Sequence, residues 1–260
     1  GGQFVVAGSR GTILTSLDGV TWTKRDSGTN AGLSAITWSG NQLVAVGEGG
    51  TILISPDGVI WTVRASKPAT SLRGITWSGN QFVAVGESGA ILTSPDGMAW
   101  TQRNSGTTAY LYDIYDITWG DNLFVAVGDS YGSRVPIGTI LTSPDGVTWT
   151  ERDQVTYFSS LRGITWSGSQ FVAVGDSFIK TSPDGMAWTQ RGSGTTAYLY
   201  DIIWGGNQFV AVGSSGTILT SPDGVTWTQH ESGTTDYLFG ITWGGNQFVA
   251  VGSSGTILTS

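Results

Sequence analysis

One seven-residue passage stands in six copies along the chain, and it constrains the fold more than any other feature. It reads Ser-Pro-Asp-Gly-Val-Thr-Trp at residues 143–149, and variants of it lie at 16–22, 55–61, 94–100, 182–188 and 221–227. The closing tryptophans are 39, 39, 49, 39 and 39 residues apart. A fixed period of about 40 residues with strand-like segments is typical of a repeat architecture.

Each repeat contains four short runs of β-branched or aromatic residues separated by turn-forming residues. In the copy at 74–102 these runs are 75–77, 82–85, 90–93 and 98–102, which we call the first, second, third and fourth strands. The Gly, Ser, Asn and Pro-Asp-Gly residues between them are typical of tight turns. A four-stranded sheet of this size cannot bury both faces alone, so neighbouring copies must stack. The sequence therefore predicts an all-β chain, with residues 1–260 forming a single β-propeller domain of four-stranded antiparallel blades.

The turn before the fourth strand has a physical reason to recur. In the copy at 94–100, Pro95 presets φ, Asp96 accepts hydrogen bonds from nearby backbone N–H groups, and Gly97 tolerates a positive φ. We call the motif Ser-x-Asp-Gly-x-x-Trp the Asp turn. It resembles the Asp-box, or BNR repeat, and the resemblance covers all six copies and almost the whole chain.

This resemblance implies a propeller of the sialidase-like and photosystem-assembly-factor-like superfamily, in which the motif lies between the third and fourth strands and has a structural role. The predicted structural residues are Asp18, Asp57, Asp96, Asp145, Asp184, Asp223, Trp22, Trp61, Trp100, Trp149, Trp188 and Trp227. The other six tryptophans end the first strands, at Trp38, Trp77, Trp119, Trp166, Trp204 and Trp243. We expect the indoles to hold blade against blade through buried apolar area. An array of indoles that stacks on sugars is the alternative.

Counting strands predicts the number of blades. The chain starts at a second strand, 3–7, and stops after a third strand, 256–259, which gives seven second and third strands but six first and fourth strands. Seven blade positions with incomplete terminal blades use every hairpin. The alternative is six blades closed by the N-terminal strand near Trp22, which leaves one hairpin surplus and able to pair with another molecule. Because the chain begins inside a repeat, we expect an excised, processed or partly observed chain.

The copies differ mainly at one end of the predicted ring. Tryptophan spacings show extra residues between fourth and first strands at 104–115, and between second and third strands at 129–138. Both kinds of connection emerge on the same end of an up-and-down blade. Loops on a rigid scaffold commonly carry binding residues, and Asp129, Tyr131 and Arg134 are our candidates in the second segment. The alternative is that added loop length is merely tolerated, since it costs little entropy.

The start of each first strand is expected at the rim of a central funnel on that variable end. Aromatic, arginine and aspartate residues gather at this position, which is the usual composition of a ligand site for a saccharide or a polar peptide. The candidate ligand-binding residues are Arg73, Tyr115, Asp116, Arg162, Tyr200, Asp201 and Phe239. The alternative is that arginines and aspartates of the rim pair with one another.

Composition excludes several function classes. With 12 Lys and Arg against 19 Asp and Glu, the chain is acidic, so we expect no nucleic-acid partner. The absence of cysteine and the single histidine, His230, exclude thiolate chemistry and Cys- or His-rich metal sites, so we predict no metal and no cofactor. Calcium held by oxygen ligands at acidic turns of the variable end is the alternative. No apolar run approaches the roughly 20 residues that span a bilayer, so no membrane insertion is expected.

The sialidase resemblance would imply an arginine triad, a tyrosine nucleophile paired with a glutamate, and an acidic acid/base residue. Only Arg73 and Arg162 occupy equivalent rim positions, so we predict no catalytic residues. A glycosidase that uses Asp116 and Asp201 as its two carboxylates is the enzymatic alternative.

The sequence favours a non-enzymatic propeller that presents its variable end and funnel to a protein or glycan. Three alternatives stay open: a lectin with repeated sugar sites between blades, a sialidase-like glycoside hydrolase, and a recently amplified or engineered propeller without an evolved partner. We expect a monomer, with a strand-swapped oligomer as the alternative. Low charge and abundant Ser, Thr, Gly and Trp favour a secreted or cell-surface bacterial protein.

Overall fold

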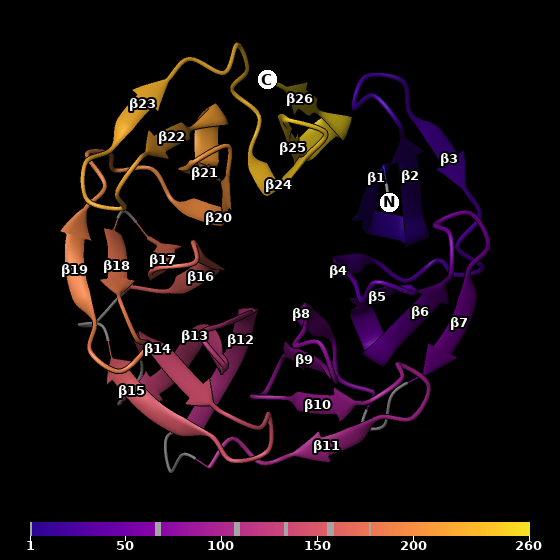
Figure 1. Cartoon of the computed structure of the whole chain (residues 1–260), viewed down its shortest axis with the longest axis horizontal. Helices are drawn as coiled ribbons and strands as arrows, with labels where there is room; N and C mark the ends of the chain where they lie inside the picture. The colour runs from indigo at the N-terminus through magenta and orange to yellow at the C-terminus, as the bar shows by residue number, and fades with distance from the viewer. Residues whose placement is uncertain (1, 66–68, 107–109, 133–134, 155–158, 177) are drawn as a thin grey trace.

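Seven antiparallel sheets stand radially around a central channel, as the computed structural model shows (Figure 1). The structure describes residues 2–65, 69–106, 110–132, 135–154, 159–176 and 178–260. Five sheets have four strands, while the first and last have three. We number the blades 1 to 7 in chain order.

Within each blade the strands follow one another from the channel to the outside. Blade 1 contains β1 (Phe4–Gly8), β2 (Thr12–Ser16) and β3 (Thr23–Arg25). Blade 2 contains β4 (Leu33–Trp38), β5 (Leu43–Gly47), β6 (Thr51–Ser55) and β7 (Thr62–Ala65). Blade 3 contains β8 (Leu72–Trp77), β9 (Phe82–Gly86), β10 (Ile91–Ser94) and β11 (Thr101–Arg103). Blades 4 and 5 contain β12 (Tyr110–Gly120), β13 (Leu123–Gly132), β14 (Val135–Ser143) and β15 (Thr150–Gln154); and β16 (Leu161–Trp166), β17 (Phe171–Gly175), β18 (Phe178–Ser182) and β19 (Thr189–Gly192). Blades 6 and 7 contain β20 (Leu199–Gly205), β21 (Gln208–Gly213), β22 (Ile218–Ser221) and β23 (Thr228–His230); and β24 (Leu238–Gly244), β25 (Gln247–Gly252) and β26 (Ile257–Thr259).

Helical structure in the described residues is confined to single turns between second and third strands. These are η1 (Ser9–Gly11), η2 (Glu48–Gly50), η3 (Ser214–Gly216) and η4 (Ser253–Gly255). None of them approaches the length or apolarity of a membrane-crossing helix.

The prediction of seven blades with incomplete ends is confirmed. Blade 1 lacks a first strand and blade 7 lacks a fourth strand, because β1 is of the second type and β26 of the third type. The six-blade alternative is wrong, since β3 pairs with β2 in its own sheet and does not complete blade 7.

The core lies between blades and not within them. In blade 5, Val172 and Val174 of β17 join a buried cluster with Leu199 and Phe209 of blade 6. The alternate residues of β17, among them Ala173, join a second cluster with blade 4. All five residues of β17 are therefore buried, which explains why second strands are continuously apolar and do not alternate.

The Asp turn is held by a closed set of hydrogen bonds. The hydroxyl of Ser143 accepts the N–H of Gly146 at 2.8 Å, and one carboxylate oxygen of Asp145 accepts the N–H groups of Val147 and Thr148 at 2.8 and 2.7 Å. The indole N–H of Trp149 donates to the carbonyl of Gly146 at 3.1 Å. Such backbone donors lower the pKa of all six aspartates, that of Asp18 to about 2.

The fourth strand begins later than the sequence predicts. In blade 3 it starts at Thr101 and not at Met98. The carboxylate of Asp96 accepts the N–H groups of Met98 and Ala99, so these donors stay in the turn and cannot join the sheet ladder. Trp100 closes the turn, and its ring lies 6.2 Å from that of Phe82 on the second strand. The same phenyl ring lies 4.4 Å from the first-strand indole of Trp77.

One hydrogen bond links neighbouring blades and also closes the ring. A glutamine at the start of a second strand, or directly before it, donates its side-chain N–H to the carbonyl of the Asp-turn aspartate in the next blade. The described pairs are Gln3 to Asp57, Gln42 to Asp96, Gln81 to Asp145, Gln170 to Asp223 and Gln247 to Asp18, at 2.6–2.8 Å. The last pair joins blade 7 to blade 1, so the ring closes without a sheet shared by both ends of the chain.

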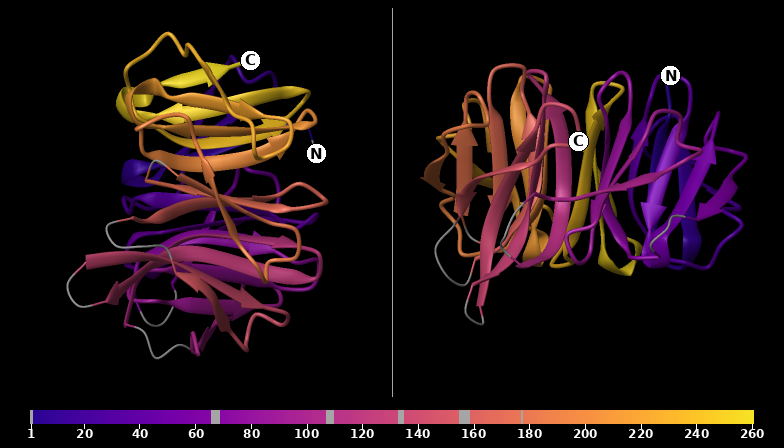
Figure 2. Two further views of the ribbon diagram at one scale, coloured as in Figure 1. Left: turned by 90° about the vertical axis from the view of Figure 1, so that its left-hand side faces the viewer. Right: turned by 90° about the horizontal axis from the view of Figure 1, so that it is seen from below.

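Segment 129–138 differs from its predicted form. We expected a loop, but β13 and β14 continue as a ladder from Gly128 and Thr139 out to Gly132 and Val135. The insertion extends both strands without breaking their pairing, and Figure 2 shows the resulting hairpin reaching beyond its neighbours at one end of the ring. The extra length is therefore built on sheet structure.

Replacing Gln247 with leucine should loosen the closure between blades 7 and 1. A side-chain hydrogen bond of this kind contributes about 0.5–1.5 kcal/mol, so we expect the free energy of unfolding to fall by that amount in urea titrations. Gln208→Leu is the matched control, because Gln208 begins a second strand whose next blade carries no Asp turn. Equal losses in both variants would contradict this role of Gln247.

Candidate functional site

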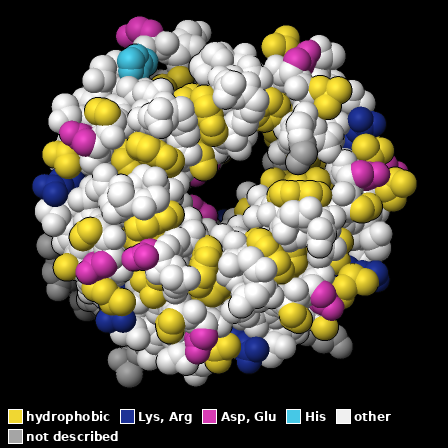
Figure 3. Space-filling view, in the orientation of Figure 1, with side chains coloured by type: hydrophobic (Ala, Val, Ile, Leu, Met, Phe, Trp, Pro, Cys, Tyr) yellow, Lys and Arg dark blue, Asp and Glu magenta, His cyan; other side chains and the backbone are white. Residues whose placement is uncertain are grey.

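The central channel forms a cavity of about 370 Å³ that is lined by the first strands and by β1. Hydrophobic side chains surround the channel opening on the face drawn in Figure 3, where the Lys and Arg side chains lie at the outer edge. The lining of the cavity is mixed, with Val5, Ile75 and Ile203 among its apolar residues and Asp116 and Asp201 among its polar ones. Residues at the start of the first strands line its mouth: Ser34, Arg73, Tyr115, Arg162, Tyr200 and Phe239. The structure thus brings together the rim residues that the sequence singled out.

A β-bulge places each rim residue. In β16, Leu161 pairs with Gly175 and Gly163 pairs with Val174, so Arg162 has no partner across the ladder. The same register shift occurs at this position in β4, β8, β12, β20 and β24. Bulges commonly re-aim a side chain out of the sheet. Sequence reasoning missed them, although the glycine after the rim residue in three copies is a usable signal.

Five rim residues from blades 3 to 7 touch in sequence, and we call them the rim arc: Arg73, Tyr115, Arg162, Tyr200 and Phe239. The guanidinium carbon of Arg162 lies 5.1 Å from the ring centre of Tyr115 and 5.7 Å from that of Tyr200. The guanidinium carbon of Arg73 lies 5.6 Å from the ring of Tyr115. The rings of Tyr200 and Phe239 are 5.3 Å apart. The rim arc is therefore a continuous cation–π and aromatic stack.

Acidic residues behind the rim arc hold its arginines and Tyr115. A terminal nitrogen of Arg73 lies 3.0 Å from both Glu87 and Asp113, and Nε of Arg162 lies 3.2 Å from Asp176. Both arginines thus pair with acids outside the predicted rim set, and neither forms an ion pair with Asp116 or Asp201.

These acids were missed as site residues, although the repeats contain a signal for two of them. The acid stands 14 residues after the rim residue in the pairs Arg73 with Glu87 and Arg162 with Asp176, and the hydroxyl of Tyr115 donates to Asp129, also 14 residues on, at 3.1 Å. The hairpin register brings the two positions together.

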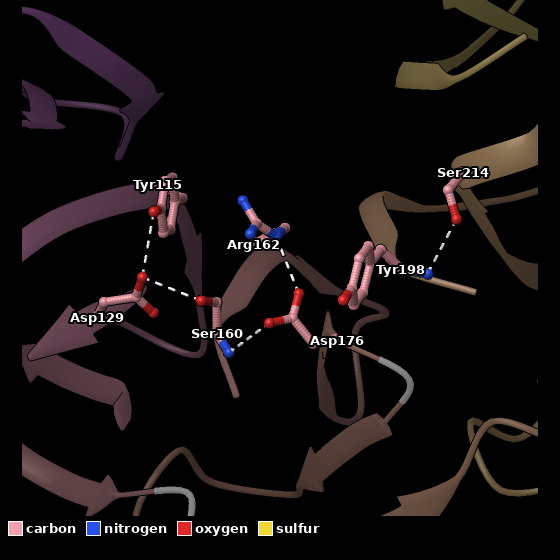
Figure 4. Close-up of polar contacts among 7 residues, drawn as sticks. All are labelled: Tyr115, Asp129, Ser160, Arg162, Asp176, Tyr198 and Ser214. Carbon is pink, nitrogen blue, oxygen red and sulfur yellow. Dashed lines mark hydrogen bonds and ion pairs between the residues drawn. The ribbon is translucent and has the colours of Figure 1, made fainter. Parts of the chain in front are cut away.

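Ser160 connects blades 4 and 5 behind the rim arc (Figure 4). Its hydroxyl donates to the Oδ2 atom of Asp129 at 3.0 Å, and its backbone N–H donates to Asp176 at 3.0 Å. Asp129 is 3% exposed, and burial raises its pKa to about 6. Its Oδ1 atom has no hydrogen-bond partner among the described residues. Asp129, predicted as a loop residue, therefore belongs to the support of the mouth.

The structure does not place the side chains of the other two predicted residues of the 129–138 segment. Tyr131 lies in β13, but its side chain is outside the described residues, and Arg134 is outside them entirely.

Asp116 and Asp201 line the channel just inside the mouth and fasten blades together. Each carboxylate accepts the N–H of its following isoleucine, and its second oxygen accepts a backbone N–H of the next blade. Asp116 binds Ile164 at 2.9 Å, and Asp201 binds Ile241 at 2.8 Å. Burial raises the pKa of Asp116 to about 8, with a further contribution from the charge of Asp201, and burial raises the pKa of Asp201 to about 7.

An aromatic cluster adjoins one end of the rim arc and is open to solvent. Tyr237 and Phe239 are 48% and 53% exposed, and their rings lie 6.2 Å apart at right angles. Tyr198, on the approach to β20, is 52% exposed. Phe239 lies on β24, while Tyr237 and Tyr198 lie directly before β24 and β20. Exposed apolar patches commonly mark interaction sites.

In the described part of the chain, no three His, Asp or Glu side chains gather as a metal site would require. His230 lies in β23, exposed, with its Nε2 atom 2.8 Å from the hydroxyl of Thr220.

Comparison with known proteins gives the fold but no family. No family model matches the sequence, and no curated protein matches it. Among solved structures, YCF48 from Cyanidioschyzon merolae is similar with a TM-score of 0.74 and 20% identity, over 99% of this chain and 91% of the other. A structure of YCF48 bound to D1 peptide has a TM-score of 0.67 and 20% identity, over 88% and 78%. The computationally designed Ika8 protein has a TM-score of 0.67 and 12% identity, over 100% and 93%. At these identities the likeness shows the shared β-propeller fold.

The raised pKa of Asp201 predicts a dependence of stability on pH. An ordinary unfolded aspartate has a pKa near 3.9, so the folded chain holds protons that the unfolded chain releases as pH rises towards about 7. Stability should therefore fall from pH 5 to pH 8. In Asp201→Asn this fall should be smaller, as measured by melting temperatures across that range. Asp121→Asn, in an exposed turn, is the control and should keep the wild-type slope. An unchanged slope in Asp201→Asn would contradict the assignment.

Proposed function

We propose that this propeller is a non-enzymatic binding module that holds an extended protein segment at the mouth of its channel. The half-exposed rings of Tyr237 and Phe239, fixed on β24 or just before it and continuous with the rim arc, carry this proposal. Rigid aromatic side chains are the usual centres of binding energy in protein interfaces, because they bury large area with little loss of conformational entropy.

Charge around the mouth favours a segment with basic side chains. The two arginines of the rim arc are accompanied by four acids, Glu87, Asp113, Asp129 and Asp176, within direct contact of the arc. The mouth therefore carries more negative than positive charge near neutral pH. The ring of Phe239, which is 53% exposed, can make cation–π contact with Lys or Arg of a partner.

The structural comparisons support a protein partner by analogy. The D1-peptide complex shows that YCF48, which shares this fold, binds a peptide. We also propose that the chain is related to Asp-box propellers, because it carries six copies of the motif. We propose a secreted or cell-surface location on the low share of charged residues, 12%.

The hydrogen bonds of the two channel aspartates, Asp116 and Asp201, favour a binding function over catalysis. Each carboxylate of Asp116 and Asp201 accepts two backbone N–H groups, which suits a structural fastening better than proton transfer to a substrate. Turnover of aryl glycosides that is lost in Asp116→Asn would instead establish the glycosidase alternative.

Selection of displayed twelve-residue peptides on the immobilised protein tests the proposal. We expect enriched peptides that combine basic and apolar residues. Their affinity, measured by fluorescence anisotropy with synthetic peptide, should fall about tenfold or more in Phe239→Ala and in Tyr237→Ala, as is typical of interface hot spots.

Met98→Ala is the matched control, since Met98 is also an apolar side chain, 54% exposed, but lies in an Asp turn. Peptides that bind Phe239→Ala as well as wild type would place binding elsewhere. A glycan array provides the opposing outcome: sugar binding with several equivalent sites per chain, and no peptide binding, would favour the lectin.

A further inference from the structure

Blades 6 and 7 carry an additional aromatic side chain beside the channel mouth. An aromatic residue stands two positions before the rim residue in these blades, which pairs Tyr198 with Tyr200 and Tyr237 with Phe239. A buried leucine separates the two members of each pair. The equivalent positions in blades 2 to 5 hold Gly32, Ser71, Asp113 and Ser160. We call Tyr198, Tyr200, Tyr237 and Phe239 the aromatic platform.

The exposure of the platform belongs to this repeat position and not only to the end of the ring. Tyr198 lies in blade 6, whose first strand has neighbouring first strands on both sides, and it is 52% exposed, close to the 48% of Tyr237 in blade 7. The ring of Tyr200 lies 5.3 Å from that of Phe239 and 6.2 Å from that of Tyr237. The platform therefore bridges blades 6 and 7.

Hydrogen bonds fix the main chain at both exposed tyrosines. The N–H of Tyr198 donates to the hydroxyl of Ser214 at 3.1 Å (Figure 4), and its carbonyl accepts the N–H of Ser214 at 2.8 Å. Tyr237 makes the same two bonds with Ser253, at 3.1 and 2.8 Å. A ligand thus meets rings on a backbone that is already ordered, which lowers the entropic cost of binding.

The polar groups of the platform are free to donate. None of its three tyrosine hydroxyls has a hydrogen-bond partner among the described residues. Desolvation raises the pKa of Tyr200, so its hydroxyl keeps the proton that it can donate. The neighbouring Arg162 pairs with Asp176 through Nε, and Figure 4 shows its terminal nitrogens on the side away from that carboxylate.

Nearby carboxylates are already engaged. Asp176 accepts the Nε–H of Arg162 at 3.2 Å and the backbone N–H of Ser160 at 3.0 Å. Glu87 and Asp113 pair with Arg73. The groups left for a ligand are therefore mainly donors beside exposed rings. A ligand that fits this surface presents hydrogen-bond acceptors together with compact apolar groups.

A proline-rich segment in the polyproline II conformation has both properties. Its main-chain carbonyls make no internal hydrogen bonds, so they are free to accept bonds from a partner. Proline lacks a backbone N–H, so it brings no donor that would need an acceptor at this surface. Aromatic-lined surfaces commonly bind such segments, because the segment is extended before it binds and loses little conformational entropy.

We propose that the segment held at the mouth is proline-rich and binds in the polyproline II conformation, with proline rings on the aromatic platform and carbonyls accepting hydrogen bonds from the tyrosine hydroxyls. This inference rests on the proposed function and names the chemical class of its ligand. Lysine or arginine beside the prolines complements the acids of the mouth, such as Glu87 and Asp176.

Two synthetic peptides of equal length and charge test the inference on the intact protein. One contains three repeats of Lys-Pro-Pro-Pro, and the other contains three repeats of Lys-Ala-Ala-Ala. Fluorescence anisotropy should show binding of the proline peptide that is at least about tenfold tighter than that of the alanine peptide. Tyr198→Ala should weaken binding of the proline peptide at least about tenfold, as is typical of an interface hot spot.

Removing a hydroxyl while keeping its ring separates hydrogen bonding from apolar contact. Tyr198→Phe and Tyr237→Phe should each weaken binding of the proline peptide about three- to tenfold, as expected for the loss of one hydrogen bond. Both variants should melt as wild type does, because the hydroxyls have no partner among the described residues. Met98→Ala, in an Asp turn, is the control and should bind the proline peptide as wild type does.

The possible outcomes distinguish this inference from the proposed function. Displayed peptides that lose binding in Phe239→Ala but contain no more proline than the library would overturn the inference and leave a peptide-binding mouth. Equal affinity for the proline and alanine peptides, or unchanged binding in both tyrosine-to-phenylalanine variants, would also contradict it. If neither the displayed nor the synthetic peptides bind, the proposed function fails together with the inference.

Discussion

Blades 2 to 6 of this protein depend on burial of their second strands by the neighbours on both sides. The run Phe171 to Gly175 is buried on both faces, but one face packs on blade 4 and the other on blade 6. No blade can therefore retain its core alone, and stability is a property of adjacent pairs. The ring must also close, because the faces of blades 1 and 7 that meet at the seam would otherwise be exposed to water. At the seam, blades 7 and 1 are held together by the hydrogen bond from Gln247 to Asp18 and by the contact of Phe4 with Gly244. Equivalent contacts hold neighbouring blades together inside the ring.

Different parts of the repeat have different roles, which explains how a uniform scaffold can carry a mouth lined by different residues in each blade. Asp turns and second strands repeat almost unchanged because they hold the ladder and the interblade core. The bulged residue of each first strand has no pairing partner, so it is free to be Ser34, Arg73, Tyr115 or Phe239 in different blades. Gly163 shows the constraint next to it: a Cβ there would lie 2.9 Å from the Cα of Asp201, so the chain around the rim residue is closely packed. Within the first strand, the residue that faces the channel mouth can therefore vary while its neighbours keep the close packing between blades.

The sequence predicted the architecture because repetition and turn chemistry are local signals. Counting hairpins yielded seven blades, and the Ser-x-Asp-Gly-x-x-Trp spacing identified the turn that Asp145 holds. The bulges and the acids behind Arg73 and Arg162 were not predicted, because they depend on hairpin register and on contacts between blades. The 129–138 segment was misread as a loop, since its insertion preserves strand pairing that composition alone does not reveal. Asp116 and Asp201 were recognised as rim residues, but their bonds to Ile164 and Ile241 follow from the close approach of adjacent blades.

Distance measurement across the seam tests most directly whether seven blades form a closed ring. The chain has no cysteine, so spin labels attach only at introduced cysteines. One pair at Val20 and Asn246 spans blades 1 and 7, and a matched pair at Asn41 and Met98 spans blades 2 and 3, each flanking one glutamine–aspartate bond. A closed ring predicts the same short, narrow distance distribution for both pairs. A longer or broader distribution for the seam pair alone would show an open ring and contradict the interdependence of the blades.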